Sequence, residues 1–202
     1  MYTIIVARYN ENIDWLTSEL SNCIIYNKGM PLQLNNEIKV DNKGRESETY
    51  LQYIISHYDK LPDVVVFTQA KISDHIGKND VNYLLYMKDV ALQNGKMHPF
   101  THYQTASNKH CWDKSWNYTN GFYLQNNYKH TPVVFHEWFT RHINATYPNP
   151  IHIYRNGLFA VKKEIILKNS LEYYKKLIEE VNHHSNPAEG HFFERSWYYI
   201  FN

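Results

Sequence analysis

Apolar residues recur with a helical period between residues 46 and 58. Leu51, Ile54 and Tyr58 stand three and four residues apart, so they would line one face of a helix. Glu46 falls in the first turn, where the positive end of the helix dipole stabilises a carboxylate. This stretch therefore predicts an amphipathic helix that packs one face against a core.

An unbroken apolar run follows this helix, from Val64 to Phe67. Pro62 separates the two, because the residue before a proline is displaced from the α region. A run of β-branched and aromatic residues without alternation is typical of a strand buried on both faces, as in a parallel sheet. Similar patterns predict further strands at residues 3–7, 23–26, 151–154 and 157–161, and helices at 15–20, 83–92 and 164–181.

Strands that alternate with helices, without repeats or an internal linker, predict a single α/β domain over residues 1–202. The sheet would be mainly parallel, with helices on both faces. Residues 30–41 are expected to be irregular. Residues 94–150 are expected to form an aromatic-rich, irregular excursion, and long loops of this kind are often functional.

Composition excludes several classes of protein. The chain has 21 Lys and Arg against 20 Asp and Glu, so no basic field marks it for duplex nucleic acid or for an anionic membrane. No apolar stretch is long enough to span a bilayer. The first residues lack a basic segment and a cleavage site, so we expect no signal peptide and a cytoplasmic location. Abundant Asn, Lys, Ile and Tyr fit an AT-rich genome, such as that of a giant virus or an AT-rich bacterium.

Polar residues directly follow the predicted strands. Arg8, Tyr9 and Asn10 come after the first strand, Asn27 after the second, and Gln69 after the run that ends at Phe67. In open α/β sheets, ligands bind outside the carboxyl ends of the strands. These residues are therefore candidates for ligand binding, although a polar N-cap for the next helix is an alternative explanation for the first group.

Arg45 follows Gly44 at the start of the predicted helix. A guanidinium at a helix N-terminus is well placed to bind phosphate or carboxylate. A structural ion pair with Glu46 or Glu48 explains the same residue equally well. Both interpretations stay open on the sequence alone.

Two further features concern metals and sugars. His136 and His142 invite comparison with the zinc-protease signature, which needs two histidines four residues apart on one helical face. Their spacing is six, so we reject a zinc site of that kind. The aromatic residues of the 94–150 region could stack on the apolar faces of sugar rings, although packing explains each single aromatic better.

Several segments carry a resemblance to a known family over nearly the whole chain. They are VARYNE at 6–11, NKGRE at 42–46, YDKLPDVVVF at 58–67, GLFAV at 157–161 and ERSWYYIF at 194–201. In this combination and order, the sequence resembles the family of proteins of unknown function DUF3431. That family in turn resembles glycosyltransferases of the GT-A fold, which is Rossmann-like and uses nucleotide-sugar donors.

The resemblance implies a donor site. It assigns base and ribose to Arg8, Tyr9, Asn10 and Asn27, and the donor diphosphate to Asn42, Gly44 and Arg45. Gln69 falls where GT-A enzymes usually carry an Asp-x-Asp metal motif. The chain has Thr-Gln-Ala there, which puts dependence on Mn²⁺ or Mg²⁺ in doubt, because such cations prefer carboxylate oxygens. Asp74, His75 and His191 could replace the missing carboxylates as metal ligands. For each of them, a structural role in a loop is the simpler explanation.

The resemblance also implies a reaction. An inverting transferase needs a carboxylate that takes the proton from the acceptor hydroxyl, and this role falls to Glu194, with Glu189 in reserve. Trp112, Trp116 and Trp138 would stack on the acceptor. We therefore expect transfer of a hexose-type sugar from a nucleotide sugar to a glycan or small acceptor. The alternative is a non-catalytic module that binds a nucleotide or a glycan. A third hypothesis, that the aromatic residues bind single-stranded nucleic acid, is poorly supported because the charge of the chain is balanced.

Overall fold

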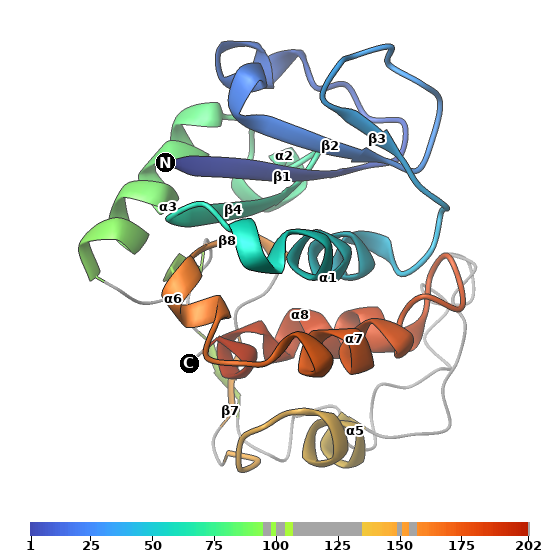
Figure 1. Cartoon of the computed structure of the whole chain (residues 1–202), viewed down its shortest axis with the longest axis vertical. Coiled ribbons are helices and arrows are strands. Elements are labelled where there is room, and N and C mark those ends of the chain that lie inside the picture. The colour runs from blue at the N-terminus through green and yellow to red at the C-terminus, as the bar shows by residue number, and fades with distance from the viewer. Residues whose placement is uncertain (95–97, 100–103, 107–134, 149–150, 154–156, 202) are drawn as a thin grey trace.

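A six-stranded sheet forms the centre of the computed structural model, which describes residues 1–94, 98–99, 104–106, 135–148, 151–153 and 157–201 (Figure 1). The strand order is β3-β2-β1-β4-β8-β5. The parallel strands are β1 (Tyr2–Arg8), β2 (Cys23–Asn27), β3 (Glu37–Lys39) and β4 (Val64–Gln69). Two antiparallel pairings complete the sheet, of β8 (Phe159–Lys162) with β4 and of β5 (His98–Pro99) with β8. The predicted α/β class with a mostly parallel sheet is thus confirmed.

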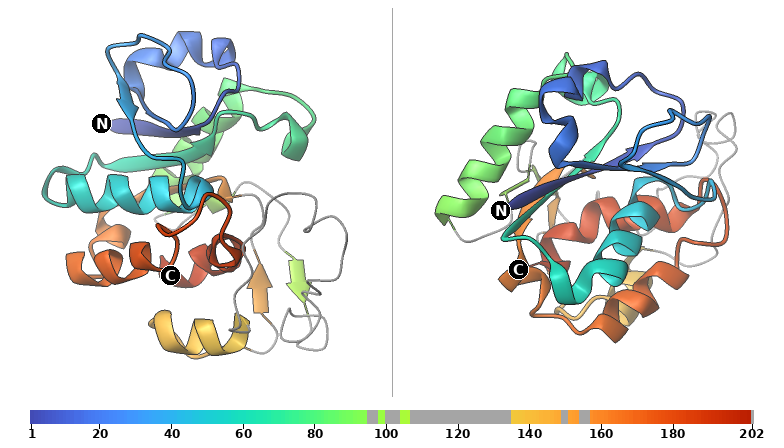
Figure 2. Two further views of the ribbon diagram at one scale, coloured as in Figure 1. Left: turned by 90° about the vertical axis from the view of Figure 1, so that its right-hand side faces the viewer. Right: turned by 45° about the horizontal axis from the view of Figure 1, so that its top comes forward.

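Helices lie on both faces of this sheet (Figures 1 and 2). One face is covered by α1 (Arg45–His57), with α7 (Leu171–Glu179), α8 (Ala188–Ile200) and α5 (Phe135–His142) beyond it. The other face is covered by the 3₁₀ helix η1 (Asp14–Asn22) and by α3 (Val81–Asn94). Short helices are η2 (Tyr58–Lys60), α2 (Ser73–Ile76) and α6 (Lys163–Ile166). Within the described ranges, no helix combines the length and the apolar character that crossing a membrane requires.

The strands contribute to two separate cores because successive side chains point to opposite faces of a sheet. On β4, Val65 and Phe67 pack under α1, while Val64 and Val66 pack under α3 and η1. All four are fully buried. This arrangement explains why the strand lacks an alternation of apolar and polar residues.

Aromatic rings fill the core between α1, β8 and α8. Trp197 on α8 lies 5.3 Å from Phe159 and 6.0 Å from Tyr50, measured between ring centroids. The Tyr50 hydroxyl donates a hydrogen bond of 2.8 Å to the carbonyl of Gly157. Because these rings come from distant parts of the chain, they fix α8 beside the N-terminal half of the fold.

Three predicted segments differ from the structure. The single helix predicted for residues 164–181 is wrong, because the chain breaks between α6 and α7, where Ser170 caps α7 by accepting the N–H of Tyr173. Residues 30–41 contain the short edge strand β3, whose pattern is mostly polar. The excursion at 94–150 contains helix α5 and strand β6 (Gln104–Ala106), which pairs with β7 (Ile151–Ile153). Much of that excursion lies outside the described residues.

The turn that leads into α1 has an unusual backbone. Gly44 and Arg45 both adopt the left-handed conformation, with φ angles of 59° and 52°. A Cβ on Gly44 would lie 2.3 Å from the Cβ of Glu48 and 2.9 Å from the carbonyl oxygen of Val181. The Gly44 N–H donates to the carbonyl of His184 at 2.8 Å. Only glycine fits this position.

We expect Gly44→Ala to destabilise the protein more than Gly77→Ala does. Both glycines have a positive φ, so each alanine incurs a cost of about 1–2 kcal/mol for the left-handed conformation. Gly77 has no atom within 4 Å of an added Cβ, whereas Gly44 adds a clash of roughly 1–3 kcal/mol. Urea unfolding of both variants measures the difference, and equal losses would contradict the packing shown for Gly44.

Candidate functional site

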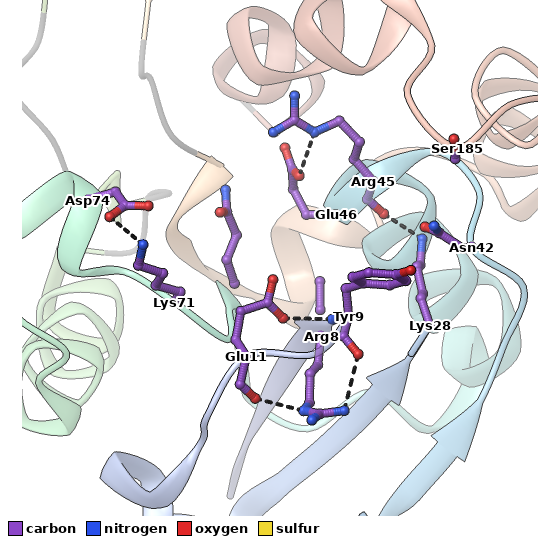
Figure 3. Close-up of a pocket in the computed structure, with 12 residues that line it drawn as sticks. Arg8, Tyr9, Glu11, Lys28, Asn42, Arg45, Glu46, Lys71, Asp74 and Ser185 are labelled. Atoms are coloured by element: carbon purple, nitrogen blue, oxygen red, sulfur yellow. Dashed lines mark hydrogen bonds and ion pairs between the residues drawn. The ribbon is translucent and has the colours of Figure 1, made fainter. Parts of the chain in front are cut away.

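A polar cavity of about 240 Å³ lies beyond the carboxyl ends of β1, β2 and β4 (Figure 3). From β1 the chain moves to β2 on one side, and it later returns to β4 on the other side of β1. Ligands of open α/β sheets bind at such a reversal of strand order. The residues that line the cavity are Ala7, Arg8, Tyr9, Glu11, Lys28, Asn42, Arg45, Glu46, Gln69, Lys71, Asp74 and Ser185.

Several predicted donor residues meet in this cavity, although they come from different strand ends. They are Arg8, Tyr9, Asn42, Arg45 and Gln69. The other predicted residues, Asn10, Asn27 and Gly44, do not line it. Asn10 accepts the N–H of Met30 at 2.8 Å, and Asn27 is fully buried. The structure therefore separates the candidates into residues that line the cavity and residues that shape its loops.

Arg8 lines the cavity but holds loops together with its guanidinium. Its Nε donates to the carbonyl of Glu11 at 2.9 Å, and its Nη1 donates to Asn27 Oδ1 at 2.8 Å and to the carbonyl of Met30 at 2.9 Å. The side chain turns away from Arg45 and toward the loop after β1 (Figure 3). Arg8 thus fixes the loops after β1 and β2, which form one wall.

Lys28, which the sequence did not single out, is the buried cation of the site. Its Nζ donates to Glu48 Oε2 at 2.8 Å, to the carbonyl of Arg45 at 2.5 Å and to the carbonyl of Lys43. Burial lowers the pKa of Lys28, and the Glu48 carboxylate acts in the opposite direction. These contacts tie the end of β2 to the first turn of α1.

Arg45 presents its side chain to the cavity, and 40% of that side chain is exposed. Its Nε lies 3.6 Å from the Glu46 carboxylate, and its Nη1 lies 3.4 Å from Nε2 of His191. Both interpretations of Arg45 from the sequence are therefore compatible with the structure. A guanidinium has five N–H donors, so the contacts with Glu46 and His191 leave capacity for an anionic ligand.

The opposite side of the cavity is formed by residues after β4. Lys71 Nζ lies 2.9 Å from Asp74 Oδ1, and His75 Nε2 lies 3.5 Å from Gln69 Oε1. Burial lowers the pKa of His75. Among the residues that the structure describes, no group of three or more His, Cys, Asp and Glu could hold a metal ion. The predicted substitutes Asp74, His75 and His191 are not part of such a group, and their role as ligands of Mn²⁺ or Mg²⁺ stays a prediction.

The predicted catalytic residues lie on α8, beside Arg45. Glu194 Oε2 accepts from Arg195 Nη1 at 3.2 Å and lies 3.7 Å from Nδ1 of His191. Glu194 does not line the cavity itself, but His191 and Arg45 connect it to the cavity. Glu189 instead faces His183 at 3.6 Å, and its side chain is nearly buried.

Of the three tryptophans predicted to stack on the acceptor, the structure describes Trp138, and this residue is buried. Trp138 is 1% exposed and packs on Phe193, with ring centroids 5.0 Å apart. Its Nε1 donates to Glu180 at 3.1 Å. The buried indole leaves no face on which an acceptor sugar could stack. Trp112 and Trp116 lie outside the described residues.

Some lining residues were missed by sequence reasoning. Lys28 and Lys71 each follow a strand end closely, so the position of a residue after a strand could have identified them. Glu11 was placed at the end of the first strand by the sequence but was given no role in the site, and its carboxylate accepts the N–H of Tyr9 at 2.7 Å. Ser185 comes from the segment between α7 and α8, and no pattern in the sequence pointed to it.

The fold and the cavity define an α/β protein with a polar, mixed-charge site at the carboxyl edge of its sheet. The chain belongs to the family described as Protein of unknown function (DUF3431), whose model matches residues 4–202. This match confirms the family to which the sequence was compared. We found no significant match among curated proteins and none among solved structures.

We expect Lys28→Met to destabilise the protein by roughly 3–5 kcal/mol, because it leaves the Glu48 carboxylate buried without its cation. Lys43→Met is the matched control, since Lys43 forms an exposed pair with Asp41 that contributes about 0–1 kcal/mol. Urea unfolding measures both losses. The double variant Lys28→Met with Glu48→Leu should recover much of the stability. Equal losses of stability in Lys28→Met and Lys43→Met would contradict a structural role for the buried pair.

Proposed function

We propose that this protein binds a nucleotide sugar in the cavity and transfers the sugar to a glycan or a small acceptor, on a GT-A-like scaffold. One observation carries the proposal: cations and hydrogen-bonding side chains line a cavity at the reversal of strand order. This is the place where nucleotide ligands bind in doubly wound sheets. The family match is compatible with the proposal but does not specify an activity.

The donor diphosphate would lie against the start of α1. No side chain caps this helix, so its first N–H groups and its dipole favour an anion. Arg45 adds a guanidinium that can form charge-assisted hydrogen bonds to phosphate oxygens. Lys71 offers a second cation from the β4 side. Asn42 and Gln69 supply amides for ribose or sugar hydroxyls.

The nucleobase would pack on Tyr9. This residue lines the cavity, and it is 50% exposed, which leaves part of the ring available to a planar partner. Stacking between a base and an aromatic side chain contributes about 1–3 kcal/mol. The loop that carries Tyr9 is held by the Arg8 network, so the ring position is set before a ligand arrives.

In the proposed reaction, the acceptor oxygen attacks the anomeric carbon of the donor sugar. The bond between that carbon and the diphosphate oxygen breaks, and its electron pair stays with the diphosphate. Arg45 and the N-terminus of α1 would stabilise the charge of this leaving group. The acceptor hydroxyl loses its proton to a base, and Glu194 belongs to the cluster on α8 that supplies it.

A non-catalytic module that binds the same ligand is the second candidate. The observation that favours it is the absence of a metal-ligand cluster within the described residues, combined with the 3.2 Å contact that holds the Glu194 carboxylate on Arg195. Both candidates require ligand binding in the cavity. Only the first requires turnover, so turnover separates them.

We expect one or more nucleotide sugars to raise the thermal unfolding midpoint of the purified protein. A ligand that binds only the folded state at 100 times its Kd stabilises by about 2.7 kcal/mol. The screen uses nucleoside diphosphates and nucleotide sugars, each with and without Mn²⁺, with inorganic phosphate and free sugars as controls. A folded protein that responds to none of the nucleotides would contradict both candidates.

We expect Arg45→Gln to weaken binding of the stabilising nucleotide by about 10- to 100-fold, because charge-assisted hydrogen bonds contribute about 1.5–3 kcal/mol. Lys43→Gln is the matched control, since Lys43 is a neighbouring cation that pairs with Asp41 at 3.1 Å. Titration calorimetry gives both Kd values. Equal Kd values for the Arg45 variant and the wild type would remove Arg45 from the donor site.

We expect Glu194→Gln to remove most of the sugar transfer while nucleotide binding stays close to that of the wild type. The amide keeps the shape of the side chain but lacks the charge that the reaction requires, which should lower turnover by about 10²–10⁴-fold. Glu179→Gln, on an exposed position of α7, is the matched control. Release of nucleoside diphosphate measures turnover, and an unchanged rate in Glu194→Gln would exclude Glu194 from catalysis.

A further inference from the structure

We propose that His191 is the residue that takes the proton from the acceptor hydroxyl, and that Glu194 is a positioning residue that acts through it. This inference rests on the proposed transfer function and deepens it, because it names the atom that receives the proton. The sequence pointed to Glu194 for this step. The arrangement of three side chains on α1 and α8 carries the revision.

His191 links Arg45, which lines the cavity, to Glu194. Its Nε2 lies 3.4 Å from Nη1 of Arg45, which lines the cavity. Its Nδ1 lies 3.7 Å from Oε2 of Glu194, one helical turn further along α8. Neither His191 nor Glu194 lines the cavity itself, and it is the imidazole that contacts the lining residue Arg45.

The chemistry of arginine determines the state of the imidazole. A guanidinium can only donate hydrogen bonds, so Nε2 of His191 must present its lone pair to Arg45. The proton of the neutral ring is then on Nδ1, which faces the Glu194 carboxylate. This is the tautomer that a general base needs, with its lone pair toward the cavity and its N–H toward a carboxylate that stabilises the imidazolium.

A second contact orients the carboxylate. Arg195 Nη1 donates to Glu194 Oε2 at 3.2 Å and to the carbonyl of His191 at 2.7 Å. The Arg195 side chain is 6% exposed, so this contact is largely shielded from solvent. Base, carboxylate and guanidinium therefore form a connected series along α8, in which each group fixes the next.

The environment of His191 keeps the ring ready to accept a proton. Burial lowers the pKa of His191, and the Arg45 and Arg195 cations act in the same direction, while Glu194 opposes them. Arg45 acts on the ring from α1, and Glu194 and Arg195 act on it from α8 itself. The lowered pKa favours the neutral ring at pH 7. The ring becomes protonated, and can no longer accept a proton, as the pH falls below 6.5, the ordinary pKa of histidine.

Arg45 connects this base to the donor. In the structure its guanidinium lies against Nε2 of His191, at 3.4 Å. A bound diphosphate attracts the guanidinium, which opens Nε2 to the acceptor hydroxyl. The acceptor O–H bond then breaks, its proton moves to Nε2, and the oxygen forms the bond to the anomeric carbon while the diphosphate leaves with the electron pair of the old bond.

The test compares His191→Asn with His183→Asn, because His183 is a partly exposed histidine whose carboxylate partner is Glu189. The probes are UDP-glucose, UDP-N-acetylglucosamine and GDP-mannose, with release of the nucleoside diphosphate as the readout and calorimetric titration of UDP and GDP as the binding control. We expect His191→Asn to lower turnover at least roughly 100-fold with unchanged nucleotide affinity. His183→Asn should match the wild type.

The pH profile of turnover separates a positioning role from a structural one. In the wild type the acid limb should have its inflection below pH 6.5, since burial lowers the pKa of His191. Glu194→Gln removes the carboxylate that favours the imidazolium, so its residual activity should show an acid limb at still lower pH. Arg45→Gln removes a cation and should move the limb to higher pH. A merely structural role for Glu194 predicts no movement.

Nuclear magnetic resonance of the His191 ring gives a readout that does not depend on turnover. We expect the Nδ1–H tautomer in the wild type, with the signal assigned by its loss in His191→Asn. The Nε2–H tautomer would overturn the inference. So would full turnover in His191→Asn while the wild type is active, which would leave the transfer function standing. A wild type that binds but never turns over a donor would overturn the transfer function as well.

Discussion

A buried lysine is the constraint on which the site depends. Lys28 carries a charge into the protein at the end of β2, and a buried charge is tolerated only when it is paired and hydrogen-bonded. Glu48 and the carbonyls of Lys43 and Arg45 meet this requirement, and they come from the first turn of α1 and the loop just before it. The chain bends sharply there, with Gly44 and Arg45 both in the left-handed conformation, and two carbonyls of this bend accept hydrogen bonds from Lys28.

The same turn brings distant parts of the chain to the cavity. The Gly44 N–H donates a hydrogen bond to the carbonyl of His184, so the segment between α7 and α8 packs against the turn. Arg45 contacts His191 on α8. On the far side of α1, the aromatic contacts of Tyr50 with Trp197 hold α8 in place. Stability and the geometry of the site are therefore coupled: a change that loosens the turn moves Arg45, His191 and the cavity wall together.

Local patterns made most of the sheet and the position of the site predictable. Apolar runs identified β1, β2 and β4, because strands buried on both faces need such runs, and the residues after them converge at one edge. Lys28–Glu48 could not be predicted, since a pair 20 residues apart depends on how strand and helix pack. Trp138 was misleading because an aromatic residue in a polar segment has the same pattern whether it binds a sugar or, as here, fills the core.

The signs of the charges around the cavity restrict which ligand fits it. Arg8 and Lys28 are committed to protein oxygens, so Arg45 and Lys71 remain to meet an anion. The carboxylates of Glu11, Glu46 and Asp74 line the same cavity and would repel a uniformly charged polyanion such as a nucleic-acid strand. Carboxylates also accept hydrogen bonds from hydroxyl groups. The nucleotide sugar that we propose has two phosphates and many hydroxyls, so it could interact with both kinds of side chain.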